Sequence, residues 1–216
     1  MYDTSECGDG GNCWPAGSAG GASFVDSEHF IGKKILKKNI SFTLLCGILK
    51  FGKGVIKMAI EKVREYFKTL GIDDKIQEFE VSSATVDLAA KAVGVEGARI
   101  CKTLSFKKGE DGCVLIQTAG DTKIDNRKFK DTFGFKAKML SPDEVLEYTG
   151  HAIGGVCAFA IEHPNVEVYC DESMKRFETV FPACGSSNSA IEFTCEELYK
   201  YSNAKQWIDV CKLKEA

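Results

Sequence analysis

The stretch Gly150-His151-Ala152-Ile153-Gly154-Gly155-Val156-Cys157 is the most informative part of this chain, because it places three glycines within six residues. It follows a helix-like segment and precedes an apolar run. Glycine adopts backbone angles that other residues avoid and lets a ligand come close to main-chain N–H groups. Clustered N–H groups of this kind can hold a carbonyl oxygen or a phosphate. The sequence therefore leaves two interpretations of residues 150–157: a simple turn, or a loop that binds an oxygen atom of a ligand.

Two further segments accompany this loop. Ile100-Cys101-Lys102-Thr103-Leu104-Ser105-Phe106 resembles a strand with one lysine among apolar neighbours, and strict alternation puts Lys102 on the apolar face with Leu104 and Phe106. A lysine on such a face either extends its amino group to water, which is a structural role, or binds an anionic partner. Phe181-Pro182-Ala183-Cys184-Gly185-Ser186-Ser187-Asn188 forms a small polar loop before another strand.

Local signals along the chain predict a mixed α+β fold. Ser141-Pro142-Asp143-Glu144 has the pattern of a capping box with proline at the first helical position. Helices are predicted at residues 60–70, 86–93, 125–133 and 142–149 and after residue 194, and strands at 76–81, 101–106, 113–118, 136–140, 166–170, 178–181, 190–194 and 207–211. Short strands interspersed with helices at irregular spacing indicate a mixed sheet rather than a regular parallel one.

Composition narrows the possible partners. The 216 residues are 44% hydrophobic and 27% charged, which is enough for one sizeable core. The net charge of −3 argues against a general polyanion binder, so DNA is not an expected partner. No run reaches the roughly 18 apolar residues of a membrane span. The nearest candidate, residues 40–51, is too short, and no membrane partner is expected.

The ten cysteines favour a reducing cytoplasm over a disulfide framework. Their spacing is irregular, no Cys-x-x-Cys occurs, and Cys101, Cys113 and Cys170 lie inside apolar strand patterns. Cysteines in such positions behave as small hydrophobic residues. With only three histidines, the chain also lacks the ligand spacing of a zinc site, and we expect neither a metal nor a cofactor.

The first 57 residues differ from the rest. Ten of the 21 glycines lie before Met58, and residues 7–23 have a composition that cannot bury a core. Residues 53–57 can be encoded by a purine-rich, ribosome-binding sequence just ahead of the Met58 codon. Two interpretations stay open: a disordered tail, or translated upstream sequence that is not native. Either way, we expect the folded domain to span residues 58–216.

The lysine strand, the Gly-Gly loop and the Gly-Ser loop, in this order, resemble the YbaK/EbsC family. That family comprises free-standing aminoacyl-tRNA deacylases and the editing insertion domain of bacterial prolyl-tRNA synthetases. The resemblance covers roughly residues 59–212 and includes the segments 85–90, 118–121 and 168–171. It implies a curved, partly barrel-like mixed β-sheet surrounded by helices. It also implies a cytoplasmic hydrolase that removes a small non-cognate amino acid from mischarged tRNA(Pro), with the aminoacylated tRNA acceptor end and prolyl-tRNA synthetase as partners.

The resemblance assigns roles to individual residues. The essential lysine of the family falls at Lys102, where it would hold the tRNA 3′ end through a phosphate or the aminoacyl group. Ester hydrolysis develops an oxyanion, and the backbone N–H groups of Gly154, Gly155 and Val156 are the candidates to stabilise it. The substrate-binding set implied by the resemblance comprises Thr103, Gly120, Gly150, His151, Val156, Cys157, Asp171, Gly185 and Ser186.

Three departures from the family pattern concern this site. Cys157-Ala158 stands where relatives usually have Ser-Pro, and His151 stands where many have tyrosine. Ser186-Ser187 replaces a Lys-Arg pair, which weakens the charge-driven part of RNA affinity, although Lys123, Arg127, Lys128 and Lys130 offer compensating charge.

Several alternatives stay open from the sequence. Cys157 with His151 would suit a thiol hydrolase, or His151 forms only a pocket wall. Asp171 has the position of an N-cap as well as of a pocket residue. A non-catalytic module that binds tRNA or a synthetase, and a hydrolase of another small acyl ester, are the two alternative functions.

Overall fold

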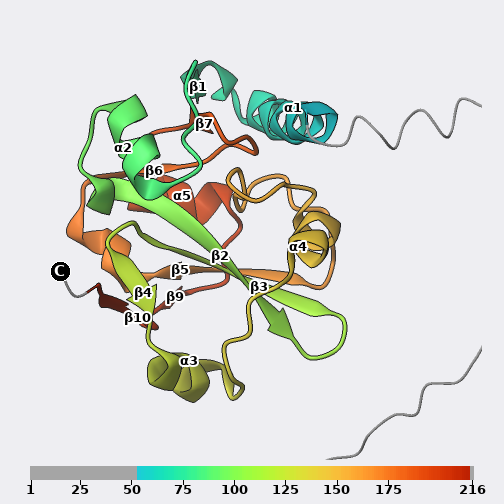
Figure 1. The fold of residues 1–216 in the computed structure, drawn as a ribbon, viewed down its shortest axis with the longest axis vertical. Helices are drawn as coiled ribbons and strands as arrows, with labels where there is room; N and C mark the ends of the chain where they lie inside the picture. The colour runs from blue at the N-terminus through green and yellow to red at the C-terminus, as the bar shows by residue number, and fades with distance from the viewer. Residues whose placement is uncertain (1–52, 215–216) are drawn as a thin grey trace, which may run out of the picture. The chain divides into compact units, whose positions relative to one another are not determined.

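The computed structural model describes residues 53–214 (Figure 1). The predicted extension lies outside the described residues except for its last five, which belong to helix α1 (Lys53–Leu70). This helix begins at Lys53 rather than at residue 60, so Met58 lies inside it. The apolar pattern used for the prediction marks core-facing positions such as the buried Ile60, Val63 and Phe67, and it does not set the first residue of the helix. Whether the domain begins at Met58 stays a prediction.

One curved, mixed sheet forms the centre of the fold, with strand order β8-β6-β2-β3-β5-β9. The predicted hairpin is confirmed, since β2 and β3 pair antiparallel along their length, while β6 and β5 join them in parallel on either side. Two smaller antiparallel pairs, β1 with β7 and β4 with β10, complete the mixed α+β architecture. The strands are β1 (Gln77–Glu78), β2 (Ile100–Lys108), β3 (Gly112–Ala119), β4 (Thr122–Ile124), β5 (Val166–Asp171), β6 (Thr179–Pro182), β7 (Ser189–Ala190), β8 (Phe193–Thr194), β9 (Trp207–Ile208) and β10 (Cys211–Leu213).

The helix boundaries follow the capping signals in the sequence. Ser141 and Thr194 each form a complete capping box, and Thr85 and Asp125 accept hydrogen bonds as N-caps. These residues begin α4 (Pro142–Thr149), α5 (Cys195–Tyr201), α2 (Val86–Val93) and α3 (Asn126–Phe133). Three short 3₁₀ turns are η2 (Asp73–Lys75), η3 (Gly97–Arg99) and η4 (Glu172–Arg176). None of the helices between residues 53 and 214 combines the length and apolarity needed to cross a membrane.

Four of the predicted strands differ from the structure. The segment 76–81 contributes only β1, and the segment 136–140 makes a single bridge between Met139 and Phe106. The segment 190–194 divides between β7 and β8, and 207–211 divides between β9 and β10. These segments pair only where the curved sheet brings a neighbour alongside, which the local pattern does not specify.

Apolar side chains cover both faces of the sheet, so β3 is buried along its whole length. One face packs against a cluster that includes Phe67, Phe159 and Phe193, and the other against a cluster centred on Phe129. The seven cysteines of the described residues are unpaired and six of them are buried. The prediction that the strand cysteines act as small hydrophobic residues is therefore confirmed.

Candidate active site

A cavity of about 390 Å³ lies beside β2, between the start of α2 and the glycine loop. Its volume falls within the range of about 300–1,000 Å³ that is common for small-ligand pockets. Of the predicted site residues, the cavity brings together Lys102, Thr103, Gly154 and Val156. Its other lining residues are mostly apolar, among them Leu140 and residues of β6 and β7.

The edge of β2 has a gap at this cavity. On one side of the gap, β6 pairs with β2 only at Ile100 and Cys101. On the other side, the Leu140 N–H donates to the Ser105 carbonyl at 3.1 Å. Thr103 lies between them, and its main-chain groups point to the same edge as those of Ser105, because alternate residues of a strand face the same neighbour. The cavity therefore meets an open stretch of strand edge.

Thr103 presents polar groups in this gap that lack partners. Because its main-chain N–H and carbonyl point away from β3, the β2–β3 ladder does not use them, and outside the ladders neither makes a hydrogen bond to another described residue. Its Oγ1 is also buried and has no partner within residues 53–214. Buried polar groups without partners are rare in folded proteins and are costly when no ligand or water meets them. The geometry thus marks Thr103 as a point where a ligand can bind.

The glycine loop places its N–H groups differently from the prediction. The Gly155 N–H donates to the Ala152 carbonyl at 3.0 Å and closes a turn. Gly154 lies in this turn with φ +93°, in the region that favours glycine. The Gly155 N–H is therefore not available to an oxyanion. The N–H groups of Gly154 and Val156, which both line the cavity, have no acceptor among the described residues.

Gly155 has a different role, which is to let two loops approach each other. A Cβ atom at this position would lie 2.6–2.8 Å from the main-chain atoms of Ser186. Real Cβ contacts are not that short, so only glycine allows the 150–157 loop to pack on the 184–188 loop. The sequence indicated the glycine but not this reason for it.

His151 and Cys157 lie close together but not in the cavity lining. The Cys157 N–H donates to His151 Nδ1 at 3.4 Å, and the Cys157 Sγ lies 3.7 Å from the same nitrogen. Burial lowers the pKa of His151 to about 4 and raises the pKa of Cys157 to about 12. Both side chains are therefore neutral near pH 7, and they are 1% and 0% exposed. A thiol hydrolase needs an accessible thiolate, so the geometry disfavours that alternative.

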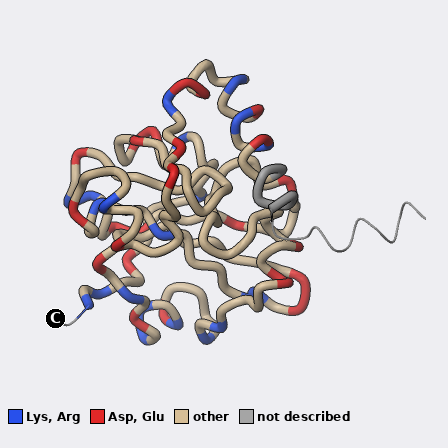
Figure 2. Tube along the Cα trace, turned by 45° about the horizontal axis from the view of Figure 1, so that its top comes forward, with Lys and Arg blue, Asp and Glu red and all other residues tan. Residues whose placement is uncertain are grey.

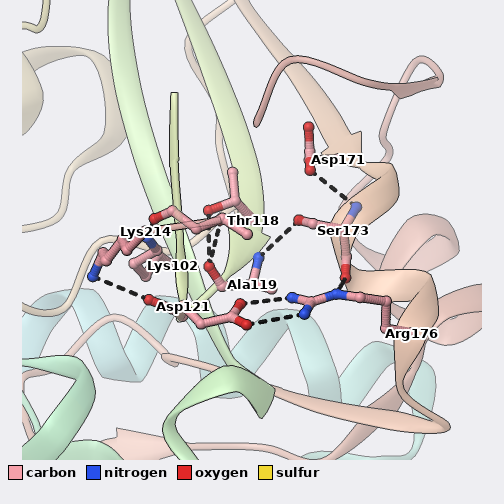
Figure 3. A network of polar contacts seen from close by, with 10 residues as sticks. Lys102, Thr118, Ala119, Asp121, Asp171, Ser173, Arg176 and Lys214 are labelled. Carbon is pink, nitrogen blue, oxygen red and sulfur yellow. Dashed lines mark hydrogen bonds and ion pairs between the residues drawn. The ribbon is translucent and has the colours of Figure 1, made fainter. Parts of the chain in front are cut away.

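Lys102 is half-buried, and it donates from Nζ to the carbonyl of Thr122. Lys102 lines the cavity, and its amino group reaches the turn between β3 and β4 (Figure 3). Burial, and then the charge of Lys214, lower the pKa of this amino group. Among the described residues, no carboxylate pairs with it, so a substrate anion would have little competition.

The structure confirms the N-cap alternative for Asp171. Its carboxylate accepts hydrogen bonds from the N–H groups of Ser173 at 3.0 Å and Val210 at 2.9 Å. The side chain is 1% exposed and begins η4 (Figure 3). With both oxygens bound to main chain, Asp171 holds the fold at a point outside the cavity lining.

The remaining predicted residues surround the cavity without lining it. Gly150 ends α4, and Gly120 lies in the turn between β3 and β4. Gly185 packs against the main chain of Ala59. Ser186 is buried and its Oγ contacts Ser189 Oγ at 2.7 Å. These positions shape the loops around the site, and their contact with a substrate stays a prediction.

Two apolar residues at the site have no counterpart in the sequence prediction. Met139 and Ile153 are 60% and 63% exposed, and both line the cavity. Their exposure gives the cavity an apolar mouth. The two residues belong to separate segments of the chain, so only the fold reveals that they lie together.

A second, larger cavity of about 490 Å³ lies between α1, the 158–166 loop and the end of α5. None of the predicted site residues lines it. Size alone would favour this cavity, but the groups without partners at Thr103, Gly154 and Val156 belong to the smaller one. We therefore place the candidate site in the 390 Å³ cavity.

The chain is similar in sequence and in structure to several known proteins. Residues 80–201 match the sequence profile of the aminoacyl-tRNA editing domain. The uncharacterized protein YwhH of Bacillus subtilis (strain 168) is 57% identical over 155 residues, which cover 72% of this chain and 98% of that protein. A crystal structure of a candidate trans-editing enzyme for prolyl tRNA synthetase is similar, with 33% identity, a TM-score of 0.64, and coverage of 73% of this chain and 98% of that one. A proline–tRNA ligase of Thermosipho melanesiensis (strain DSM 12029 / CIP 104789 / BI429) is 28% identical over 127 residues, which cover 58% of this chain and 22% of the ligase.

Proposed function

Because this chain belongs to the aminoacyl-tRNA editing domain family, we propose that it is a trans-editing hydrolase that cleaves the ester of mischarged aminoacyl-tRNA in the cytoplasm. The observation that carries the proposal is that one cavity is lined both by Thr103, at the gap in the strand edge, and by Gly154 and Val156, whose N–H groups have no acceptor among the described residues. An aminoacyl ester supplies the hydrogen-bond partners that these groups lack. Its carbonyl oxygen accepts hydrogen bonds, and its amino group donates them. The finer proposal is tRNA(Pro) as the substrate, supported by the two relatives linked to proline charging.

The proposed reaction uses water as the nucleophile. The water oxygen attacks the aminoacyl carbonyl carbon, the carbonyl oxygen becomes an oxyanion, and the Gly154 and Val156 N–H groups stabilise its charge. Collapse of this intermediate breaks the bond to the ribose oxygen, which leaves with a proton that came from the water. The products are the free amino acid and the tRNA. Preorganised donors of this kind lower the barrier by several kcal/mol.

No side-chain base is assigned to the water. Among the described residues that line the cavity, none carries a carboxylate or an imidazole. Rate enhancement would therefore come from orienting the ester and the water, and from the oxyanion donors, with the amino group of the substrate available as an internal base. The size of the cavity and its apolar lining favour a small amino-acid side chain.

Steady-state deacylation of a panel of charged tRNAs tests the proposal. The panel includes tRNA(Pro) carrying alanine, cysteine or proline, and other tRNAs carrying their own amino acids. We expect turnover of at least one small non-cognate ester of tRNA(Pro), with proline left in place, and the same rate in the presence of a chelator. Binding without turnover would identify a non-catalytic module, and turnover of simple acyl esters alone would identify a different hydrolase.

We expect Thr103→Val to separate the substrate contact from stability. This change keeps the shape of the side chain and removes the buried hydroxyl that has no partner. A lost hydrogen bond costs about 0.5–1.5 kcal/mol, so kcat/KM should fall about two- to tenfold. The melting temperature should stay the same or rise, because an unsatisfied polar atom is removed.

Ser202→Ala is the matched control for this variant. The Ser202 hydroxyl is also buried, but it donates to the Leu198 carbonyl at 2.6 Å and does not line the site. We expect the opposite result, a lower melting temperature with kcat/KM unchanged. If Thr103→Val lowered stability and left kcat/KM unchanged, the hydroxyl would be a structural group.

A further inference from the structure

The C-terminal strand places a second lysine beside Lys102. β10 pairs antiparallel with β4, so Leu213 lies opposite Thr122. The Lys214 N–H then donates to the Asp121 carbonyl at 2.9 Å, and its Nζ donates to the Gly120 carbonyl at 3.3 Å. Because Lys102 Nζ donates to the Thr122 carbonyl, both ammonium groups are held on a single turn, residues 120–122.

The two lysines lack a direct ion-pair partner among the described residues, and the Asp121 carboxylate acts on Lys102 only from a distance. Within residues 53–214, neither lysine forms an ion pair. The carboxylate of Asp121 is engaged by Arg176 through two hydrogen bonds of 2.6 and 2.9 Å. Figure 3 shows this carboxylate turned towards Arg176, with both lysines on its other side. An ammonium group has three donors, and a single carbonyl bond leaves the others available to an anion.

The two charges also act on each other. The charge of Lys214 is, after burial, the largest contribution that lowers the pKa of Lys102. Two like charges held on one turn repel each other, and an anion bound between them would relieve this repulsion. Lys214 is exposed, and Lys and Arg positions recur around the C-terminal end of the described chain (Figure 2).

We propose that Lys102 and Lys214 together bind the phosphate that joins the last two nucleotides of the RNA, at the rim of the editing cavity. The inference rests on the proposed function and deepens it. In an aminoacyl-tRNA this phosphate is one ribose away from the ester. Lys102 lines the cavity and its ammonium lies at the turn, so one residue would link the ester site to the phosphate site.

Lys214 lies outside residues 80–201, which match the editing-domain profile. Its place at the site follows from the pairing of β10 with β4, which brings it to the turn that also holds Lys102. A phosphate contact here would supply part of the RNA affinity that is weakened by Ser186-Ser187 in the 184–188 loop. Lys214 would act as a positioning residue that aligns the ester, without touching the reacting atoms.

The test compares Lys214→Gln with Lys212→Gln on two substrates. Lys212 is exposed on the same strand but is directed to Asp125, with Nζ 3.5 Å from its carboxylate. The substrates are a charged tRNA that the parent protein deacylates and the matching aminoacyl-adenosine, which has no phosphate. We expect Lys214→Gln to lower kcat/KM on the tRNA by about three- to tenfold, mainly through KM, because one exposed charge-assisted contact is lost.

A salt series gives a second readout that a structural role would not change. Each phosphate contact contributes about 0.7 to the slope of log affinity against log salt concentration for single-stranded nucleic acid. We expect the slope to decrease by about that amount for Lys214→Gln and to stay unchanged for Lys212→Gln. Both variants should cleave aminoacyl-adenosine at the parent rate. Equal losses on the two substrates, or no loss on tRNA, would overturn the phosphate assignment while leaving deacylation intact.

Failure of the proposed function can be distinguished from failure of the phosphate site. If the parent protein cleaved no charged tRNA, its binding to a short single-stranded RNA ending in CCA, followed by fluorescence anisotropy, would still test the lysine pair. Weaker binding and a smaller salt slope for Lys214→Gln would support the phosphate site in a non-catalytic module. Unchanged binding would show that Lys214 does not contact an RNA phosphate.

Discussion

Lys102→Ala should reduce kcat/KM on a charged tRNA by more than about a hundredfold while the protein stays folded. A lost charge-assisted contact costs about 1.5–3 kcal/mol, which is roughly tenfold to a hundredfold in rate, and misplacing the ester adds to this. The melting temperature should change little, because the ammonium is only half-buried and its one described partner is the Thr122 carbonyl. Deacylation kinetics and thermal unfolding of the same preparations measure both effects.

Two companion variants sharpen this result. Lys102→Arg should rescue poorly, because a planar guanidinium cannot replace a compact ammonium. Lys107→Ala, on the same strand, removes a lysine that pairs with Glu144 at 3.1 Å and does not line the cavity, so kcat/KM should stay unchanged. A Lys102→Ala enzyme within threefold of the parent would reject the assigned site and favour a binding module.

Gly155→Ala should damage both activity and stability. The added Cβ would meet the main chain of Ser186 at 2.6–2.8 Å, and main-chain atoms cannot move aside as a flexible side chain can. Either the 150–157 loop or the 184–188 loop must shift, which displaces the Gly154 and Val156 N–H groups from the ester. A displacement of about 1 Å at a reacting centre can cost about a hundredfold in rate. Overpacking of this kind typically costs about 1–3 kcal/mol of stability.

Gly112→Ala provides the matched control. Its Cβ would lie 2.6 Å from the Lys108 carbonyl oxygen, a comparable main-chain collision at the far end of the β2–β3 hairpin. We expect a similar loss of melting temperature with kcat/KM preserved. If Gly155→Ala matched Gly112→Ala in both measurements, the glycine loop would contribute to folding and not to catalysis.

Features that depend on neighbours in sequence were predictable. The capping residues Thr85, Asp125, Ser141 and Thr194 begin helices where the sequence places them, because a cap satisfies N–H groups two or three residues away. The β2–β3 hairpin is equally local. The short strands were less predictable, because β9 and β10 follow each other closely in sequence but pair with β5 and β4 in different sheets.

The candidate site was predictable in its residue types and less so in its geometry. The lysine strand and the glycine loop do meet at one cavity. The turn that occupies the Gly155 N–H, and the gap at Thr103, depend on hydrogen bonds between distant segments. The position of Lys214 beside Lys102 depends on the pairing of β10 with β4. The spacing of residues in the sequence does not show which distant segments come into contact.

The buried thiols of the core make transient opening of the protein measurable. Burial raises the pKa values of Cys113, Cys157 and Cys170 to about 12, and the thiolate is the form that alkylating reagents attack. These residues should therefore be labelled only when the core is transiently exposed. The labelling rate of each cysteine would then report the free energy of the opening that exposes it, without any introduced probe.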